Sequence, residues 1–174
     1  MKKIILTAVA VFVLSFANAQ DAGFKAGIHF GMPMGDAANV YSFNWGIDAA
    51  YLWPVADQFQ AGVTTGYSSF SGKSISTPGL SLGPISLPGT SVKVNAAFIP
   101  LAATGLYSFS DKIFGGLDLG YALYSGSGGG TGGVYYQPKV GYQTEKYEIY
   151  AGYKGISVSG GSVSSVGLGF NYKF

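Results

Sequence analysis

Apolar residues recur at every second position along most of this chain. In one segment they occupy the odd positions: Tyr41, Phe43, Trp45, Ile47, Ala49, Tyr51 and Trp53. Small or polar residues fill most of the positions between them: Ser42, Asn44, Gly46, Asp48, Ala50 and Leu52. A period of two places the two sets on opposite faces of a β-strand, whereas the helical period of 3.6 residues cannot separate them. The pattern therefore predicts extended strands.

The same alternation divides the chain into eight candidate strands. They cover residues 22–32, 41–53, 59–67, 92–109, 113–123, 134–143, 147–154 and 165–174. In the fourth, Val94, Ala96 and Phe98 fall on the apolar face, and the pattern then blurs near Pro100. Because proline cannot complete a regular ladder, we expect a bulge there.

The distribution of charge predicts what surrounds these strands. Charged residues make up only 10% of the chain, and within the strands all of them lie on the polar face. With the single histidine they form a predicted lumen network: Lys25, His29, Asp48, Lys93, Asp118, Lys139, Glu148, Lys154 and Lys173. A soluble barrel would instead place charge outside and apolar residues inside. The apolar face is therefore expected to contact lipid, where a lysine at the bilayer midplane costs about 2–4 kcal/mol.

The connections between the strands alternate in length. Short ones at 54–58, 110–112 and 144–146 alternate with longer segments rich in Gly, Ser and Pro at 33–39, 71–91, 125–133 and 157–162. Short periplasmic turns and long external loops are typical of outer-membrane barrels. The sequence thus predicts an all-β, eight-stranded antiparallel up-and-down transmembrane β-barrel, monomeric and surrounded by outer-membrane lipid.

The N-terminus has the pattern of a secretory signal peptide over residues 1–19. Lys2 and Lys3 precede an apolar stretch from Ile4 to Phe16, and Ala17 and Ala19 form a small-x-small cleavage site. We therefore expect export and a mature barrel domain at 20–174, located in the outer membrane of a Gram-negative bacterium.

Two stretches resemble the outer-membrane β-barrel domain family, the small porin-like barrels of the OmpA and OmpX kind. One runs from Phe98-Ile99-Pro100-Leu101 through Leu106–Phe114 to Gly116–Tyr121. The other ends the chain with alternating apolar residues: Leu168, Phe170, Tyr172 and Phe174. The second resembles the signal by which the barrel-assembly machinery recognises its clients. The resemblance implies location and fold rather than an activity.

Few residues offer catalytic or cofactor chemistry. The chain has no Cys and one His, so we expect no cofactor and no metal site. Ten Lys, no Arg and eight carboxylates form no polyanion-binding surface, which argues against nucleic acid as a partner. His29 has no Ser at an evident spacing, so the chain is predicted not to be an enzyme. A lipid-modifying outer-membrane enzyme is a remote alternative.

Two functional hypotheses remain open from the sequence. The favoured one is a structural or surface-interaction role in which side chains fill the lumen, with Phe114, Tyr135 and Tyr150 pointing inward. The alternative is a narrow porin-like channel for small polar solutes or ions, favoured by inward glycines such as Gly62 and Gly66. Loop 71–91 could project as a hairpin whose edge pairs with an extracellular partner, or it could fold inward and plug the lumen.

Overall fold

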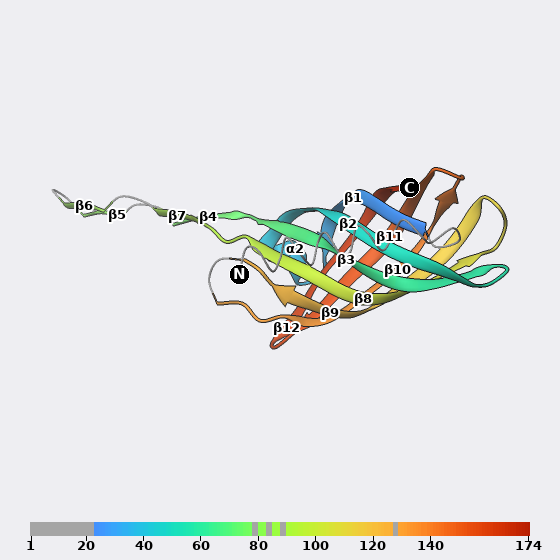
Figure 1. Cartoon of the computed structure of the whole chain (residues 1–174). Helices are drawn as coiled ribbons and strands as arrows, with labels where there is room; N and C mark the ends of the chain where they lie inside the picture. Colours follow the sequence, from blue (N-terminus) through green and yellow to red (C-terminus); the bar gives the residue numbers. More distant parts are fainter. Residues whose placement is uncertain (1–22, 78–79, 83–84, 88–89, 127–128) are drawn as a thin grey trace, which may run out of the picture.

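Eight antiparallel strands close into a barrel, which confirms the predicted fold (Figure 1). The computed structural model describes residues 23–77, 80–82, 85–87, 90–126 and 129–174. The predicted signal peptide and its cleavage site at Ala17 and Ala19 lie outside these residues. The barrel strands are β1 (Gly23–Met34), β2 (Tyr41–Ala56), β3 (Phe59–Gly72), β8 (Ala96–Ser108), β9 (Ile113–Tyr124), β10 (Gly133–Gln143), β11 (Tyr147–Val158) and β12 (Gly161–Lys173).

Each strand pairs with its neighbours in the chain, and the last strand closes on the first. In that seam Ile28 of β1 lies opposite Phe170 of β12, and the backbone N–H of Phe174 donates to the Phe24 carbonyl at 3.0 Å. A short helix, α2 (Ala37–Val40), joins β1 to β2. Within the described ranges, no helix is long and apolar enough to cross a membrane.

The barrel is apolar outside and polar inside. Large hydrophobic side chains remain exposed on the outer face, as at Leu101 (54% exposed) and Leu168 (63%). Charged side chains are buried inside it, as at Asp118 (2%) and Glu148 (1%). This is the inverse of a water-soluble barrel and matches a barrel whose outer face contacts lipid.

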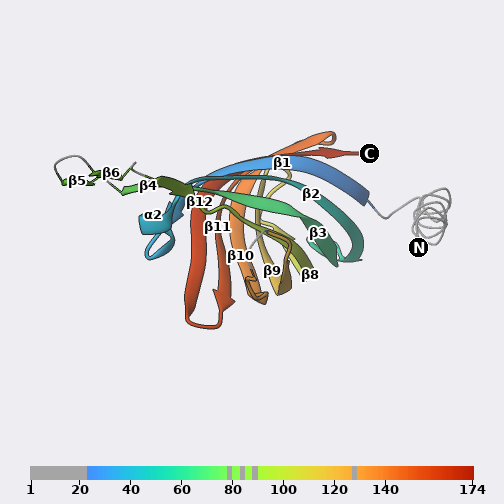
Figure 2. The same ribbon diagram turned by 90° about the vertical axis from the view of Figure 1, so that its left-hand side faces the viewer.

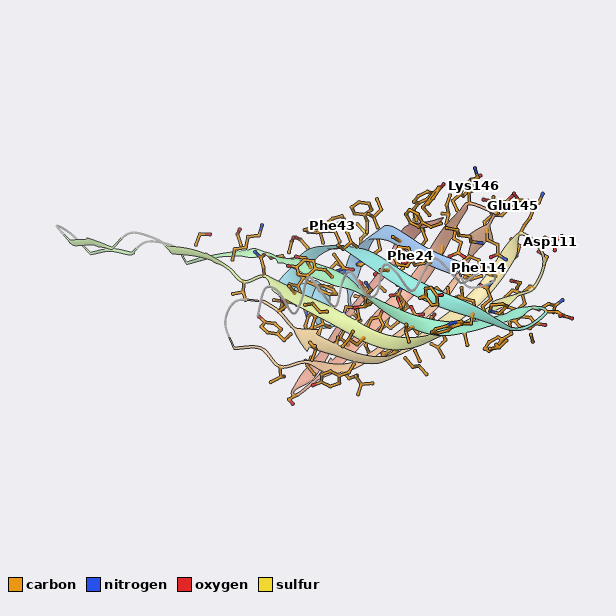
Figure 3. The ribbon with its side chains drawn as sticks, viewed as in Figure 1. Phe24, Phe43, Asp111, Phe114, Glu145 and Lys146 are labelled. Atoms are coloured by element: carbon orange, nitrogen blue, oxygen red, sulfur yellow. The ribbon has the colours of Figure 1, made fainter. Side chains whose placement is uncertain are left out.

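The two ends of the barrel differ. At one end, here called the turn end, short connections at 57–58, 109–112 and 144–146 join the strands. Figure 3 shows Asp111, Glu145 and Lys146 at this end. At the opposite end, the predicted long connection at 157–162 is wrong. β11 continues to Val158 and β12 already begins at Gly161, because Gly160 adopts a φ of +94° and completes a two-residue turn between them.

A two-stranded ribbon extends from the end opposite the turns (Figures 1 and 2). The described residues between positions 73 and 95 form this segment, which is called the ribbon, and the end from which it extends is called the ribbon end. β4 (Ser74–Thr77) pairs with β7 (Thr90–Lys93), and further out β5 (Leu80–Leu82) pairs with β6 (Ile85–Leu87). Of the two arrangements considered for loop 71–91, the described residues take the projecting one.

The fourth predicted strand is corrected in two respects. β8 begins at Ala96, and Ala96 and Phe98 face the interior rather than lipid, with exposures of 3% and 2%. Phe98 packs edge-on against Phe70, with ring centroids 6.1 Å apart, so an apolar interior cluster sets the orientation of this strand. No bulge occurs at Pro100, because Pro100 stays in register with Ala122 of β9 and loses pairing only towards β3.

Candidate functional site

Two apolar clusters fill part of the lumen. The one toward the ribbon end contains Phe70, Ala96, Phe98, Ala102, Ala122, Tyr135 and Ile156. The one toward the turn end contains Leu52, Leu106, Phe114 and Tyr150. The inward aromatics singled out in the sequence, Phe114, Tyr135 and Tyr150, therefore occupy the space that the inward glycines leave.

The first polar group of the lumen centres on Glu148. Its carboxylate pairs with the Lys25 ammonium and accepts from Asn171 Nδ2 at 3.3 Å. Lys173 Nζ lies 3.4 Å from the same carboxylate and also donates to Gln143 Oε1 at 3.2 Å. Two cations thus share one buried anion, and amide groups complete the coordination.

A second polar group joins β8, β9 and β10. The Asp118 carboxylate accepts both 2.8 Å and 2.9 Å bonds from Lys139 Nζ and a further bond from the Thr104 hydroxyl. Lys139 also lies 5.7 Å from the centroid of the Tyr150 ring, within the range of a cation–π contact. The Asp118 charge is therefore fully matched inside the barrel.

A third polar group surrounds His29. Nδ1 lies 2.7 Å from Asp48 Oδ2, while Nε2 lies 2.8 Å from Lys154 Nζ and 3.2 Å from Ser68 Oγ. A lysine ammonium can only donate, so Nε2 accepts and Nδ1 carries the proton donated to Asp48. Ser68 Oγ also accepts from Asn44 Nδ2 at 2.9 Å. These contacts join β1, β2, β3 and β11.

No serine stands at an evident sequence spacing from His29, but the fold brings Ser68 beside it. Asp48, His29 and Ser68 stand in the order of a hydrolase triad. Ser68 is 1% exposed, however, and Lys154 occupies the Nε2 lone pair that a general base would use. The void beside His29 and Lys154 measures about 20 Å³, room for about one water molecule. Ser68 and His29 are thus buried members of a hydrogen-bond network that also includes Asn44 and Lys154.

The sequence pattern does not identify Ser68, because it predicts a third strand that ends at Tyr67. β3 continues to Gly72, and Ser68 falls on the inward parity with Gly62 and Gly66. Extending the alternation by one residue would have found it.

The prediction that Lys93 lies in the lumen is wrong. Lys93 ends β7, pairs in register with Ser74 and is exposed at the base of the ribbon. Val94 and Asn95 separate it from β8, so the alternation of the barrel strand does not extend to it. The other eight predicted network residues, Lys25, His29, Asp48, Asp118, Lys139, Glu148, Lys154 and Lys173, all take part in the contacts above.

The polar lumen is closely packed and satisfied. Among the described residues, no buried side-chain nitrogen or oxygen lacks a hydrogen-bond partner. A void lined by Lys25, Asp48, Asp118 and Lys139, among others, also measures about 20 Å³. No cluster of three or more His, Cys, Asp or Glu that could hold a metal is found in the described part of the chain.

The alternating C-terminal residues lie on the outer face of β12. Leu168, Phe170, Tyr172 and Phe174 are 63%, 42%, 42% and 75% exposed. The Phe174 ring packs against Tyr172 at 4.9 Å and against Phe24 across the seam at 5.4 Å. The residues of the predicted assembly signal thus border the strand pair that closes the barrel.

Solved structures share this architecture, although no family model and no curated protein matches the chain. Ail, the attachment invasion locus protein of Yersinia pestis, is 14% identical, with a TM-score of 0.51 over 88% of this chain and 97% of that one. Its backbone structure in a phospholipid bilayer nanodisc is 13% identical, with a TM-score of 0.53 over 88% and 99%. A de novo designed transmembrane β-barrel is 11% identical, with a TM-score of 0.53 over 89% and 98%. At these identities the likeness shows a common fold, in agreement with the resemblance seen in the sequence.

Proposed function

We propose that the mature chain is a monomeric, non-conducting outer-membrane barrel that presents the ribbon to an extracellular partner. The single observation that carries this proposal is the contrast between the packed lumen and the projecting ribbon. An eight-stranded barrel is just wide enough for side chains to fill, and the two voids among its polar lumen residues measure about 20 Å³ each. The lumen therefore has little space for a solute, whereas the ribbon projects from the barrel and can contact other molecules.

The outer face supports the membrane location. Its exposed aliphatic residues would be costly in water but favourable in lipid, and the charged residues of the barrel strands lie inside. The proposal places the turn end in the periplasm, with export by the segment 1–19 and insertion by the barrel-assembly machinery acting on Leu168, Phe170, Tyr172 and Phe174.

The ribbon supports a surface-interaction role because, among its described residues, neither strand pair has a third strand on either edge. Between Lys73 and Lys93 it carries no charge, and edge strands usually carry charges that prevent unwanted pairing. An isolated two-stranded ribbon is only marginally stable in water, so a third strand would stabilise it. The partner we propose is an extended segment of another protein that adds to one of these edges.

Conductance of the purified, refolded protein in a planar lipid bilayer tests the lumen. A heat-dependent gel shift confirms insertion and folding independently of current. We expect inserted protein without current steps. Stable, reproducible steps would contradict the proposal and favour the narrow channel, in which Asp48, Asp118 and Lys139 would be tested for ion selectivity.

Trypsin treatment of intact cells tests the orientation. We expect cleavage after Lys73 and Lys93, which are exposed at the base of the ribbon. Lys112 and Lys146 in the short turns serve as internal controls, because they should become accessible only after the outer membrane is permeabilised. The reverse pattern of cleavage would overturn the proposed orientation.

A further inference from the structure

A groove opens beside the base of the ribbon. It measures about 670 Å³, and its lining includes Tyr67, Ser69, Lys93, Asn95, Ser125 and Gly126. Tyr67 and Ser69 occupy the outward positions of β3, because Ser68 and Phe70 between and beside them are buried inside. The groove, here called the interface groove, therefore lies on the outer side of the barrel wall, at the ribbon end.

An interruption in strand pairing lies on the turn-end side of the interface groove. Pro100 lacks a backbone N–H, and β3 and β8 are not paired between Thr65–Leu101 and Ser68–Phe98. Beyond it, the Asn95 side-chain oxygen accepts from the Gly72 N–H at 2.9 Å, in place of a backbone carbonyl. The Ser125 N–H donates to the Ala97 carbonyl at 2.8 Å and fixes the opposite wall. Hydrogen bonds thus connect both walls of the groove to neighbouring strands.

The chemistry of the interface groove suits an anion with hydroxyl groups. Lys93 is exposed and takes part in none of the ion pairs found among the described residues. The hydroxyls of Ser69, Ser125 and Tyr67 add donors and acceptors, and none of the described residues that line the groove is a carboxylate. The edge of the groove nearest the turn end is aromatic, because the Tyr67 ring packs edge-on against the outward Trp45 ring, with centroids 6.2 Å apart.

We propose that the interface groove binds the phosphate-bearing headgroup of an outer-leaflet lipid. In this arrangement Lys93 contacts the phosphate, and the hydroxyls of the groove contact the sugar or glycerol oxygens. The acyl chains lie on the apolar outer face, on the turn-end side of Tyr67. A lipid rather than a free anion is the occupant, because the polar lining continues directly into the lipid-facing surface of β2 and β3. This inference rests on the proposed function, since it needs the ribbon end to face outward.

The test measures lipid retained by the purified full-length mature protein. The protein is reconstituted in phosphatidylcholine vesicles that contain a minority of diphosphorylated lipid A, extracted in mild detergent and analysed by native mass spectrometry. We expect one retained lipid A per barrel. Lys93→Gln should lower retention about tenfold, because a charge-assisted hydrogen bond to phosphate is lost. The heat-dependent gel shift verifies that the variant is folded.

Lys73→Gln is the matched control. Lys73 lies at the base of the same ribbon, but it does not line the groove and its Nζ donates to the Ala38 carbonyl. Retention by this variant should equal that of the wild type. Equal losses in the two variants would indicate general surface attraction and overturn the site, as would unchanged retention in Lys93→Gln.

Competition separates a lipid site from a free-anion site. Inorganic phosphate in millimolar excess should leave lipid A bound, because the acyl chains contribute to retention. Complete displacement would overturn the lipid assignment. The trypsin experiment is independent of this one. If lipid retention depends on Lys93 but the orientation is inverted, the proposed function is contradicted and a phosphate-binding groove remains.

Discussion

Buried ions in this protein are satisfied by other residues of the wall rather than by solvent. Glu148 takes partners from β1 and β12, and Asp118 from β8 and β10. Breaking a buried pair by removing one partner leaves an uncompensated charge, which is strongly destabilising. Each lumen charge therefore ties strands together across the barrel, and its removal should be measurable as stability.

Glu148→Gln should destabilise the barrel. The substitution leaves Lys25, which is 4% exposed, without its counter-ion, and the expected loss is about 3–5 kcal/mol of unfolding free energy. Urea unfolding of the refolded protein in lipid vesicles, followed by Trp fluorescence, measures it. Glu145→Gln in the exposed turn at 144–146 is the control and should match the wild type. Equal stability of the two variants would show that the Lys25–Glu148 pair contributes nothing.

Ser68→Ala tests whether the group around His29 is a network or a catalytic triad. We expect wild type and variant to hydrolyse a nitrophenyl ester at the same background rate, because no substrate reaches the buried hydroxyl. The variant should lose about 1–3 kcal/mol of stability, since Asn44 and Lys154 lose an acceptor. Ester hydrolysis that the wild type performs and Ser68→Ala does not would favour the enzyme alternative.

At the scale of the strands, close backbone approach determines which positions tolerate a side chain. Neighbouring strands of a small, strongly curved barrel crowd their inner faces, where glycine is frequent. At Gly62 a Cβ atom would lie 1.9 Å from the Tyr51 carbonyl oxygen, a distance that rigid backbone cannot accommodate. At Gly161 nothing lies within 4 Å.

Gly62→Ala should therefore prevent normal closure of the β2–β3 pair, while Gly161→Ala should be tolerated. The expected result is loss of the heat-dependent gel shift in the first variant and its retention in the second. A folded, heat-modifiable Gly62→Ala barrel would mean that β2 and β3 separate more readily than their register indicates.

Phe174→Ala should lower the yield of assembled barrel in the outer membrane. Phe174 directly follows β12, the strand that closes on β1, and packs against Phe24, so its loss weakens both the proposed assembly signal and the seam. Phe109→Ala is matched, because Phe109 is also an exposed aromatic at the turn end, at 64%, but lies away from the seam. Heat-modifiable protein in outer-membrane fractions is the measure. Equal yields would argue against a role for the C-terminal aromatic.

At the scale of the whole molecule, barrel and ribbon are separate structural units. The ladder of the barrel passes directly from β3 to β8, and the described strands of the ribbon pair only with each other, β4 with β7 and β5 with β6. Replacing residues 75–91 by a short turn should therefore leave the unfolding midpoint and the gel shift unchanged while abolishing partner binding. A large loss of barrel stability would show that the ribbon supports the wall.

The alternation of residues determined much of this protein without reference to any structure. A period of two and a lumen-side set of charges require strands with one apolar and one polar face, and Lys139, Asp118 and Glu148 could be assigned to the interior on parity alone. The assignment failed for Lys93 and for Ala96 and Phe98. Lys93 belongs to β7 rather than to the barrel strand, and β8 carries apolar residues on both faces, so an apolar residue there can contact either lipid or an interior cluster.

What only the tertiary structure decided is which residues meet across the barrel. His29, Ser68 and Lys154 come from three different strands, with up to 125 positions between hydrogen-bonded partners. The alternation gives the face on which a side chain lies, but which side chains touch across the barrel also depends on strand stagger and on the size of the residues opposite. Hence the sequence determined a lipid-facing barrel, while closure and packing decided that its lumen is filled, that His29 has a serine neighbour, and that the ribbon projects beyond the wall.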